Sequence, residues 1–207
     1  MHWKKTIGRQ KMNQLFEEIR ACKLCSQHLP LGPRPVFSVS GKSKILVIGQ
    51  APGTRVHASG VPWNDPSGNE LRRWLNVDRE LFYNTHHFSI MPMGFCYPGK
   101  GVSGDLPPRP ECAPQWHSKL WDIMKGVELT LLIGKYAHNY YLGRRRKKSL
   151  TENIKSYREF LPDYFPLVHP SPRNKRWHIN NPWFKQELVP ELQNKVHQVL
   201  QLKHESR

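Results

Sequence analysis

Long apolar runs are missing from this chain, and their absence excludes one large class of proteins. No segment approaches the roughly 20 consecutive apolar residues that a membrane-spanning helix needs. The first residues, Met1 to Lys5, are basic, but no apolar stretch follows them, so we expect no secretory signal. We therefore expect a cytoplasmic protein without a membrane segment.

Acidic residues are scarce, with 16 Asp and Glu against 32 Lys and Arg, which gives a formal net charge of +16. Such an excess suits a polyanionic partner, because each Lys or Arg near a phosphate releases condensed counterions. We favour a nucleic acid as that partner. There are two alternatives. The charge could serve solubility alone, or it could bind an anionic membrane surface, although no long basic amphipathic helix supports membrane binding. Nothing in the sequence indicates a protein partner, and we expect a monomer.

Cysteine is scarce too, with four in 207 residues. In a reducing cytoplasm such residues are more often metal ligands or buried thiols than disulfides. Cys22 and Cys25 form a C-x-x-C pair, whereas Cys96 and Cys112 lie 16 positions apart. A zinc ribbon prefers two close pairs, so the spacing favours an iron–sulfur cluster on four thiolates over zinc. Unliganded or redox-active cysteines are the third alternative.

The pattern of apolar residues predicts an α/β fold. The length suits one hydrophobic core, so we predict a single domain over residues 1–207. Short apolar runs predict buried strands at 44–49, 81–91, 129–134 and 165–169. Helical spacing predicts helices at 9–21, 67–75, 115–125, 135–142 and 182–203. Residues rich in Pro, Gly and Ser predict loops at 30–43, 51–66 and 92–114. Strands that alternate with helices indicate three layers, with a central four-stranded parallel sheet covered on both faces.

Polar segments follow or end three of the predicted strands. They are Gly49–Gly53, His86-His87 and His169–Asn174. In open parallel sheets the ligand lies beyond the carboxyl ends of the strands. We therefore expect these segments to converge on one crevice.

Several of these segments resemble a known family. Gly49-Gln-Ala-Pro-Gly53 after a strand, with His169-Pro-Ser-Pro-Arg-Asn174 near the C-terminus, resembles the two signature motifs of uracil-DNA glycosylases. The segment Gly60–Gly68 is similar to the family's Gly-x-Pro-Phe segment, which precedes a turn and a helix. The cysteine spacing resembles the iron–sulfur branch, families 4 and 5, and matches cover nearly the whole chain.

The resemblance implies a DNA-repair glycosylase. Such an enzyme hydrolyses the N-glycosidic bond of uracil, or of another deaminated base, in DNA. The resemblance further implies a 4Fe-4S cluster with four thiolate ligands, on Cys22, Cys25, Cys96 and Cys112.

This chain departs from the family pattern at several positions. Gln50 and Ala51 stand where relatives carry acidic residues, so neither supplies a carboxylate. A noncatalytic DNA-binding protein on the same scaffold is therefore one alternative, and a glycosylase for hypoxanthine or xanthine is another. Ile90 stands where family 4 places its third cysteine, so Cys96 would reach the cluster from a remodelled loop.

Two residues are the candidate catalytic groups. The resemblance implies that His169 donates a hydrogen bond to the departing base, and the alternative is a strand-end histidine bonded to nearby backbone. Asp65 would orient water or stabilise the sugar cation. Its alternative role is an ordinary helix N-cap, with Pro66 in the first turn.

Five residues are the candidate base-binding groups. Gln50 and Ala51 would line the pocket, and Gly53 would leave room for larger bases. Trp63 would stack on the base, unless it is a buried core residue. His86 would read the base edge, with a core histidine as the alternative.

The segment after the second motif is the candidate DNA contact. Its residues are Ser171, Arg173, Asn174, Lys175 and Arg176. We expect a wedge and phosphate contacts from Arg173 and Asn174, and the alternative is a solvated basic turn. The basic run Arg144–Lys148 would add nonspecific affinity and speed the search for a site.

Overall fold

The computed structural model describes the backbone of residues 2–202 and the side chains of residues 10–202. Met1, where the basic N-terminal segment starts, and Lys203, the predicted end of the closing helix, lie outside the described residues. Within the described part, no helix is both long enough and apolar enough to cross a membrane.

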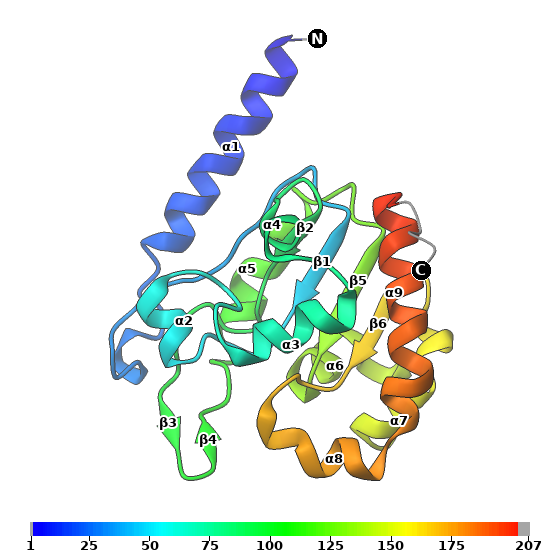
Figure 1. Cartoon of the computed structure of the whole chain (residues 1–207). Coiled ribbons are helices and arrows are strands. Elements are labelled where there is room, and N and C mark those ends of the chain that lie inside the picture. The colour runs from blue at the N-terminus through cyan, green and yellow to red at the C-terminus, as the bar shows by residue number, and fades with distance from the viewer. Residues whose placement is uncertain (1, 203–207) are drawn as a thin grey trace.

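Four short strands form one parallel sheet in the order β2-β1-β5-β6 (Figure 1). They are β1 (Ile45–Ile48), β2 (Phe88–Ile90), β5 (Leu129–Ile133) and β6 (Tyr164–Leu167). Every residue of β1, β2 and β5 is buried. This burial explains why the strands read as continuous apolar runs rather than as an alternating pattern.

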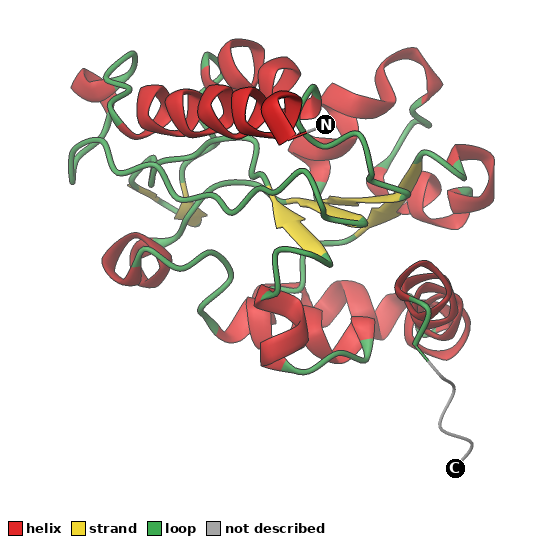
Figure 2. Cartoon of the chain, turned by 90° about the horizontal axis from the view of Figure 1, so that it is seen from above, coloured by secondary structure: helices red, strands yellow, loops and turns green. Residues whose placement is uncertain are grey.

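Helices cover both faces of the sheet, and Figure 2 shows the sheet between them. Ile45 and Val47 of β1 belong to one hydrophobic cluster, and Leu46 and Ile48 to another, because successive side chains of a strand point to opposite faces. The first cluster includes residues of α3 (Pro66–Leu75), α4 (Arg79–Tyr83), α7 (Leu150–Lys155) and α9 (Val189–Leu200). The second includes residues of α1 (His2–Arg20), α5 (Cys112–Trp121) and α6 (Lys135–Leu142). The predicted three-layer α/β/α class is confirmed.

Two elements project beyond the carboxyl edge of the sheet, at the bottom of Figure 1. One is an antiparallel hairpin of β3 (Lys100–Gly101) and β4 (Gly104–Asp105). The other is α8 (Lys175–Asn180), which follows β6. A π-helix, Phe184–Leu188, then leads into α9.

The strand predicted over 81–91 is wrong in its first half. Asp78 accepts a hydrogen bond from the Leu81 amide at 2.7 Å, and this cap starts α4, whose Phe82 is buried. Only Phe88–Ile90 forms the strand. The predicted loop 51–66 contains α2 (Thr54–Ser59), and the predicted loop 92–114 contains the hairpin.

Candidate active site

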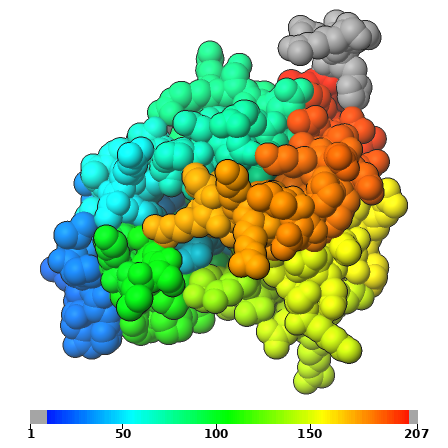
Figure 3. Space-filling view, turned by 60° about the horizontal axis from the view of Figure 1, so that its bottom comes forward, coloured from blue at the N-terminus to red at the C-terminus, as the bar shows by residue number. Residues whose placement is uncertain are grey.

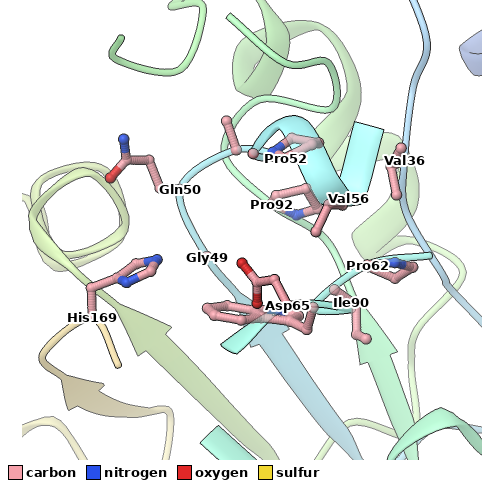
Figure 4. A pocket seen from close by; sticks show the side chains of 13 residues that line it. Val36, Gly49, Gln50, Pro52, Val56, Pro62, Asp65, Ile90, Pro92 and His169 are labelled. Carbon is pink, nitrogen blue, oxygen red and sulfur yellow. The ribbon is translucent and has the colours of Figure 1, made fainter. Parts of the chain in front are cut away.

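A pocket opens at the carboxyl edge of the sheet, around a cavity of about 50 Å³ (Figure 4). Its walls come from the segment after β1, the turn before α3, the end of β2 and the residue that follows β6 and Val168. Six of the predicted site residues meet here: Gln50, Ala51, Gly53, Trp63, Asp65 and His169. The remaining wall is mostly apolar, from Val36, Val56, Pro62, Ile90 and Pro92. The sequence singled out none of these five for the pocket, because each reads as ordinary core or loop.

Backbone hydrogen bonds hold the segment after β1 in place. The amide of Met93 donates to the Gly49 carbonyl, and the amide of Gly94 donates to the Gln50 carbonyl, each at 3.0 Å. Gly49 lies under the Trp63 indole, since a Cβ atom there would stand 2.7 Å from the ring. A glycine at this position therefore lets the indole approach the backbone.

Trp63 is held by the start of α3. Its backbone has φ 57°, in the left-handed region that non-glycine residues rarely adopt. The buried Arg72 donates to the Trp63 carbonyl at 3.4 Å. A Cβ atom on Gly68 would overlap that same carbonyl oxygen. The close packing of α3 on this backbone therefore fixes where the indole lies.

Asp65 caps α3 and also faces the pocket. Its Oδ1 accepts a hydrogen bond from the Gly68 amide at 2.8 Å, and Pro66 occupies the first helical turn. Asp65 is also among the residues that line the cavity. The two roles that the sequence set against each other are thus geometrically compatible, because the cap occupies one carboxylate oxygen.

His169 projects into the same space as Asp65 (Figure 4). Burial lowers the pKa of its imidazole to about 4, although the Asp65 carboxylate acts in the opposite direction. The ring lies 5.5 Å from the Trp63 ring, at a tilt of 32°. The His169 carbonyl accepts a hydrogen bond from Asn174 Nδ2 at 2.7 Å. His169 is therefore neutral at pH 7, and its backbone is tied to the loop that follows.

His86 lies away from the pocket, contrary to the predicted convergence. His87, its neighbour, accepts hydrogen bonds through its carbonyl from the amides of Lys44 and Ile45, so both histidines lie where β1 begins. The His86 ring is 3.3 Å from Lys42 Nζ. The first half of the predicted strand forms a helix and a turn, so the two histidines come before β2 in the chain. They therefore lie at its amino end rather than at its carboxyl end.

The space beside Gly53 is also smaller than expected. A Cβ atom on Gly53 would lie 3.2 Å from Oδ2 of Asp105, which the β3–β4 hairpin brings to this point. The room that Gly53 leaves is therefore bounded by a carboxylate. Asp105 is far from the motifs in the sequence, and only the position of the hairpin brings it near them.

A wide groove of about 890 Å³ leads to the pocket. Hairpin residues 101–107 line one side, and residues 171–174 with Trp177 line the other. Gln50, Gly53, Asp65 and His169 line both the groove and the pocket, so the two spaces are continuous.

The candidate DNA-contact residues divide into exposed side chains and side chains that shape the loop. Arg173, Lys175 and Arg176 are exposed. Ser171 Oγ accepts a hydrogen bond from the Arg173 amide at 3.3 Å, and the Asn174 amide group donates to His169 as described above. Ser171 and Asn174 thus order the loop, and its three cations are exposed.

The basic run Arg144–Lys148 is partly neutralised within the fold. Arg145 pairs with Asp163 at 3.4 Å, and Lys147 pairs with Glu159. Arg146 donates to the side chain of Asn139 at 3.2 Å. The run therefore presents less free positive charge than its sequence suggests.

The four cysteines surround a second, smaller cavity. Cys22, Cys25, Cys96 and Cys112 line it together, and all four are free thiols. The Phe95 amide donates to Cys112 Sγ at 3.3 Å. Burial raises the pKa of the Cys96 thiol to about 11 and that of Cys112 to about 12. Among the described residues, no group of three or more His, Cys, Asp or Glu side chains is arranged to hold a metal ion.

The sequence that carries the two motifs and the pocket matches a known family. A family model described as the Uracil DNA glycosylase superfamily matches residues 37–193. The matched span holds the whole sheet, the pocket and the segment after the second motif, and it begins beyond Cys22 and Cys25. On this match, which covers most of its length, the chain belongs to the uracil DNA glycosylase superfamily, a family of DNA glycosylases.

Proposed function

We propose that this protein removes uracil from DNA by hydrolysing its N-glycosidic bond. One observation carries the proposal: Asp65 and His169 line one pocket that opens onto a groove of about 890 Å³. The target nucleotide leaves the base stack and its base enters the pocket. Water then bonds to C1′ of the sugar as the base departs with the bonding electrons. The products are the protonated free base and an abasic sugar.

His169 stabilises the departing base. Negative charge develops on the base oxygens as the glycosidic bond breaks, and a preorganised donor lowers the energy of that state. Because burial lowers the imidazole pKa to about 4, His169 is uncharged at pH 7 and donates its hydrogen bond as a neutral ring. The hydrogen bond from Asn174 to the His169 carbonyl supports its position.

Asp65 serves the sugar. The anomeric carbon becomes cationic in the transition state, and a carboxylate nearby stabilises it or orients the attacking water. One oxygen of Asp65 caps α3, which keeps the carboxylate in a fixed place, and the other oxygen remains for this work. Asp65 therefore takes the role that Gln50 and Ala51 cannot fill.

Base recognition falls to Gln50 and Trp63. A Gln side chain offers both donors and an acceptor, which suits a base edge that presents both kinds of group. The Trp63 indole supplies a flat surface on which a base stacks. Ala51 and Gly53 add little bulk beside the mouth of the pocket.

Cys22, Cys25, Cys96 and Cys112 would hold an iron–sulfur cluster of the 4Fe-4S type. A single Zn²⁺ needs all four sulfurs about 2.3 Å from one point. The four thiols line one cavity, and a multi-iron cluster binds four thiolates around such a space. When bound, the cluster supplies a cross-link between the Cys22–Cys25 segment and the segment that carries Cys96 and Cys112.

The cluster has its own test. Anaerobically purified protein should be brown, with broad visible absorbance and about four iron atoms per chain. Cys112→Ser should reduce the iron content and lower the melting temperature, because ligation is coupled to folding. Colourless protein with one zinc per chain would replace the cluster with a zinc site.

A panel of damaged bases tests the proposed reaction. Single-turnover assays should use oligonucleotides with uracil, hypoxanthine or xanthine, each single-stranded and in duplex. We expect release of uracil to be fastest. Release of a deaminated purine alone would change the substrate and keep the reaction. Tight DNA binding with no base released from any substrate would indicate a noncatalytic DNA-binding protein, the alternative that the absence of an acid at positions 50 and 51 favours.

A further inference from the structure

The tip of the β3–β4 hairpin exposes an apolar side chain that does not stabilise the fold. Lys100 pairs with Asp105 and Gly101 with Gly104, which leaves Val102 and Ser103 at the tip. Val102 is fully exposed, more so than any other large apolar side chain in the described part of the chain. Leaving such a side chain in water forgoes the stabilisation that burial would bring.

The base of the hairpin is firmly anchored. The Leu106 amide donates to the Gly99 carbonyl at 2.8 Å. A Cβ atom on Gly99 would lie 3.1 Å from the Pro30 side chain, so the hairpin packs against the loop that contains Pro30. At the other strand, Asp105 lies against Gly53 of the first motif. Val102 is thus presented from a fixed position relative to the pocket.

The hairpin faces the second motif across the groove. In Figure 3 the green hairpin and the orange segment after β6 lie on either side of a hollow, with cyan atoms visible inside it. The Arg173 guanidinium lies so close to Gly104 that a Cβ atom on this glycine would overlap it. The groove between them continues to Asp65 and His169. A DNA strand that delivers a base to the pocket must therefore pass beside the hairpin.

We propose that the hairpin tip is a wedge that enters duplex DNA beside the nucleotide whose base occupies the pocket. This inference rests on the proposed function. Apolar side chains inserted between base steps unstack them, and that unstacking costs about a few kcal/mol per step. Val102 fills the space that the extruded base leaves, so burial of its side chain offsets part of this cost. Gly101 and Gly104 keep the tip narrow enough to enter the stack.

Charge supports an apolar rather than an electrostatic role for the hairpin. Lys100 and Asp105 are its two charged residues, and they oppose each other in the pairing, so the hairpin has no net charge. Phosphate contacts then belong to the opposite wall, where Arg173 lies. The two sides of the groove therefore divide the work: the basic wall holds the backbone and the hairpin opens the stack.

The test compares Val102→Ala with wild type on paired and unpaired DNA. We expect excision from single-stranded DNA to remain within twofold of wild type, because no stack must be opened. Excision from a duplex with uracil opposite adenine should fall about tenfold, or about 1.4 kcal/mol. A duplex with uracil opposite guanine should show a smaller loss, because that pair is weaker. Leu31→Ala removes an exposed loop side chain outside the groove, and it should leave all three rates unchanged.

A second measurement separates the wedge from the chemistry. Duplex DNA with 2-aminopurine beside a stable abasic analogue reports unstacking by fluorescence and needs no base removal. Wild type should raise the fluorescence and Val102→Ala should raise it less. Equal duplex excision by wild type and Val102→Ala would overturn the wedge, and so would an equal loss on paired and unpaired DNA. A wild-type protein that unstacks the probe and releases no base would instead refute the proposed function and leave the wedge standing.

Discussion

Single residues in the pocket do more than one task, and Asp65 is the clearest case. Its carboxylate caps α3 through the Gly68 amide and also faces the cavity. His169 also has two tasks. Its carbonyl accepts a hydrogen bond from the side-chain amide of Asn174, and its ring faces Asp65 in the pocket. A substitution at either position must therefore be chosen so that only one of the two tasks is lost.

Asp65→Asn makes that separation. Asn caps a helix about as well as Asp, so the melting temperature should stay within a few degrees of wild type. The charge is lost, and single-turnover excision should fall on the order of a hundredfold, as for other preorganised electrostatic groups. His169→Ala should cost a similar factor while DNA binding persists. Wild-type excision by Asp65→Asn would leave Asp65 as a cap only.

The start of α3 is the element that places both Trp63 and Asp65. Gly68 allows the helix to lie against the Trp63 carbonyl, and Arg72 donates to the same oxygen. This element explains how a tryptophan comes to have φ 57° at the wall of the pocket. The close approach of backbone to backbone requires a glycine, because no side chain fits between them.

Gly68→Ala should disturb stability and activity together. The added Cβ atom would overlap the Trp63 carbonyl, so the turn or the helix must move, at a cost of about 1–3 kcal/mol of unfolding free energy. Excision should fall too, because Trp63 shifts with the turn. Gly126→Ala is the matched control, since a Cβ atom there meets nothing closer than 3.6 Å. Equal melting temperatures for the two variants would argue against the close contact at Gly68.

The positive charges of the molecule differ in how far nearby carboxylates neutralise them. The net charge is +16, yet two cations of the run Arg144–Lys148 are paired with carboxylates. Of the exposed cations after the second motif, Arg173 lines the groove instead. Affinity for DNA should therefore depend more on the second group.

Salt dependence measures that difference. The logarithm of the association constant should fall linearly with the logarithm of salt concentration, by about 0.9 for each phosphate neutralised on a duplex. Arg173→Ala should reduce the slope by about 1. Arg145→Ala, in which the lost cation was already paired with Asp163, should reduce it much less. Equal slopes for the two variants would contradict the assignment of the groove as the DNA site.

Stability of the whole molecule should depend on pH through buried histidines. His117 and His138 are each 1% exposed, and burial lowers each pKa from 6.5 to about 4. His117 interacts with the Pro92 carbonyl and the Tyr141 hydroxyl, and His138 with the Leu132 carbonyl. The carbonyl contacts raise each pKa, so burial is what keeps both rings neutral.

The sign of the pH effect follows from these values. Between about pH 6.5 and pH 4 the unfolded chain binds protons that the folded chain does not, so the free energy of unfolding falls as pH falls. Each histidine should contribute a slope on the order of 1 kcal/mol per pH unit in that window and nothing above it. Urea denaturation from pH 7.5 to 4.5 measures the slope. His138→Gln should flatten it, and an unchanged slope in that variant would show that His138 titrates normally.

Local patterns in the sequence determined most of the architecture. Buried parallel strands are continuously apolar, so three of the four were evident at 44–49, 129–134 and 165–169. The helix at 135–142 agrees with α6. The two motifs follow strands, which located the crevice, and the family resemblance named Gln50, Trp63, Asp65 and His169 for it.

Tertiary structure alone decided which distant segments meet. The apolar residues at 81–91 contain part of a helix that Asp78 caps, so His86 lies at the amino edge of the sheet rather than at its carboxyl edge. Asp105 reaches Gly53, and Gly104 lies against Arg173, because the base of the hairpin packs against the loop at Pro30. The pKa of His169 likewise depends on burial by segments far along the chain. Strand and helix patterns reflect neighbours a few residues apart, whereas the pocket, its charges and its groove depend on packing between elements, which local patterns do not encode.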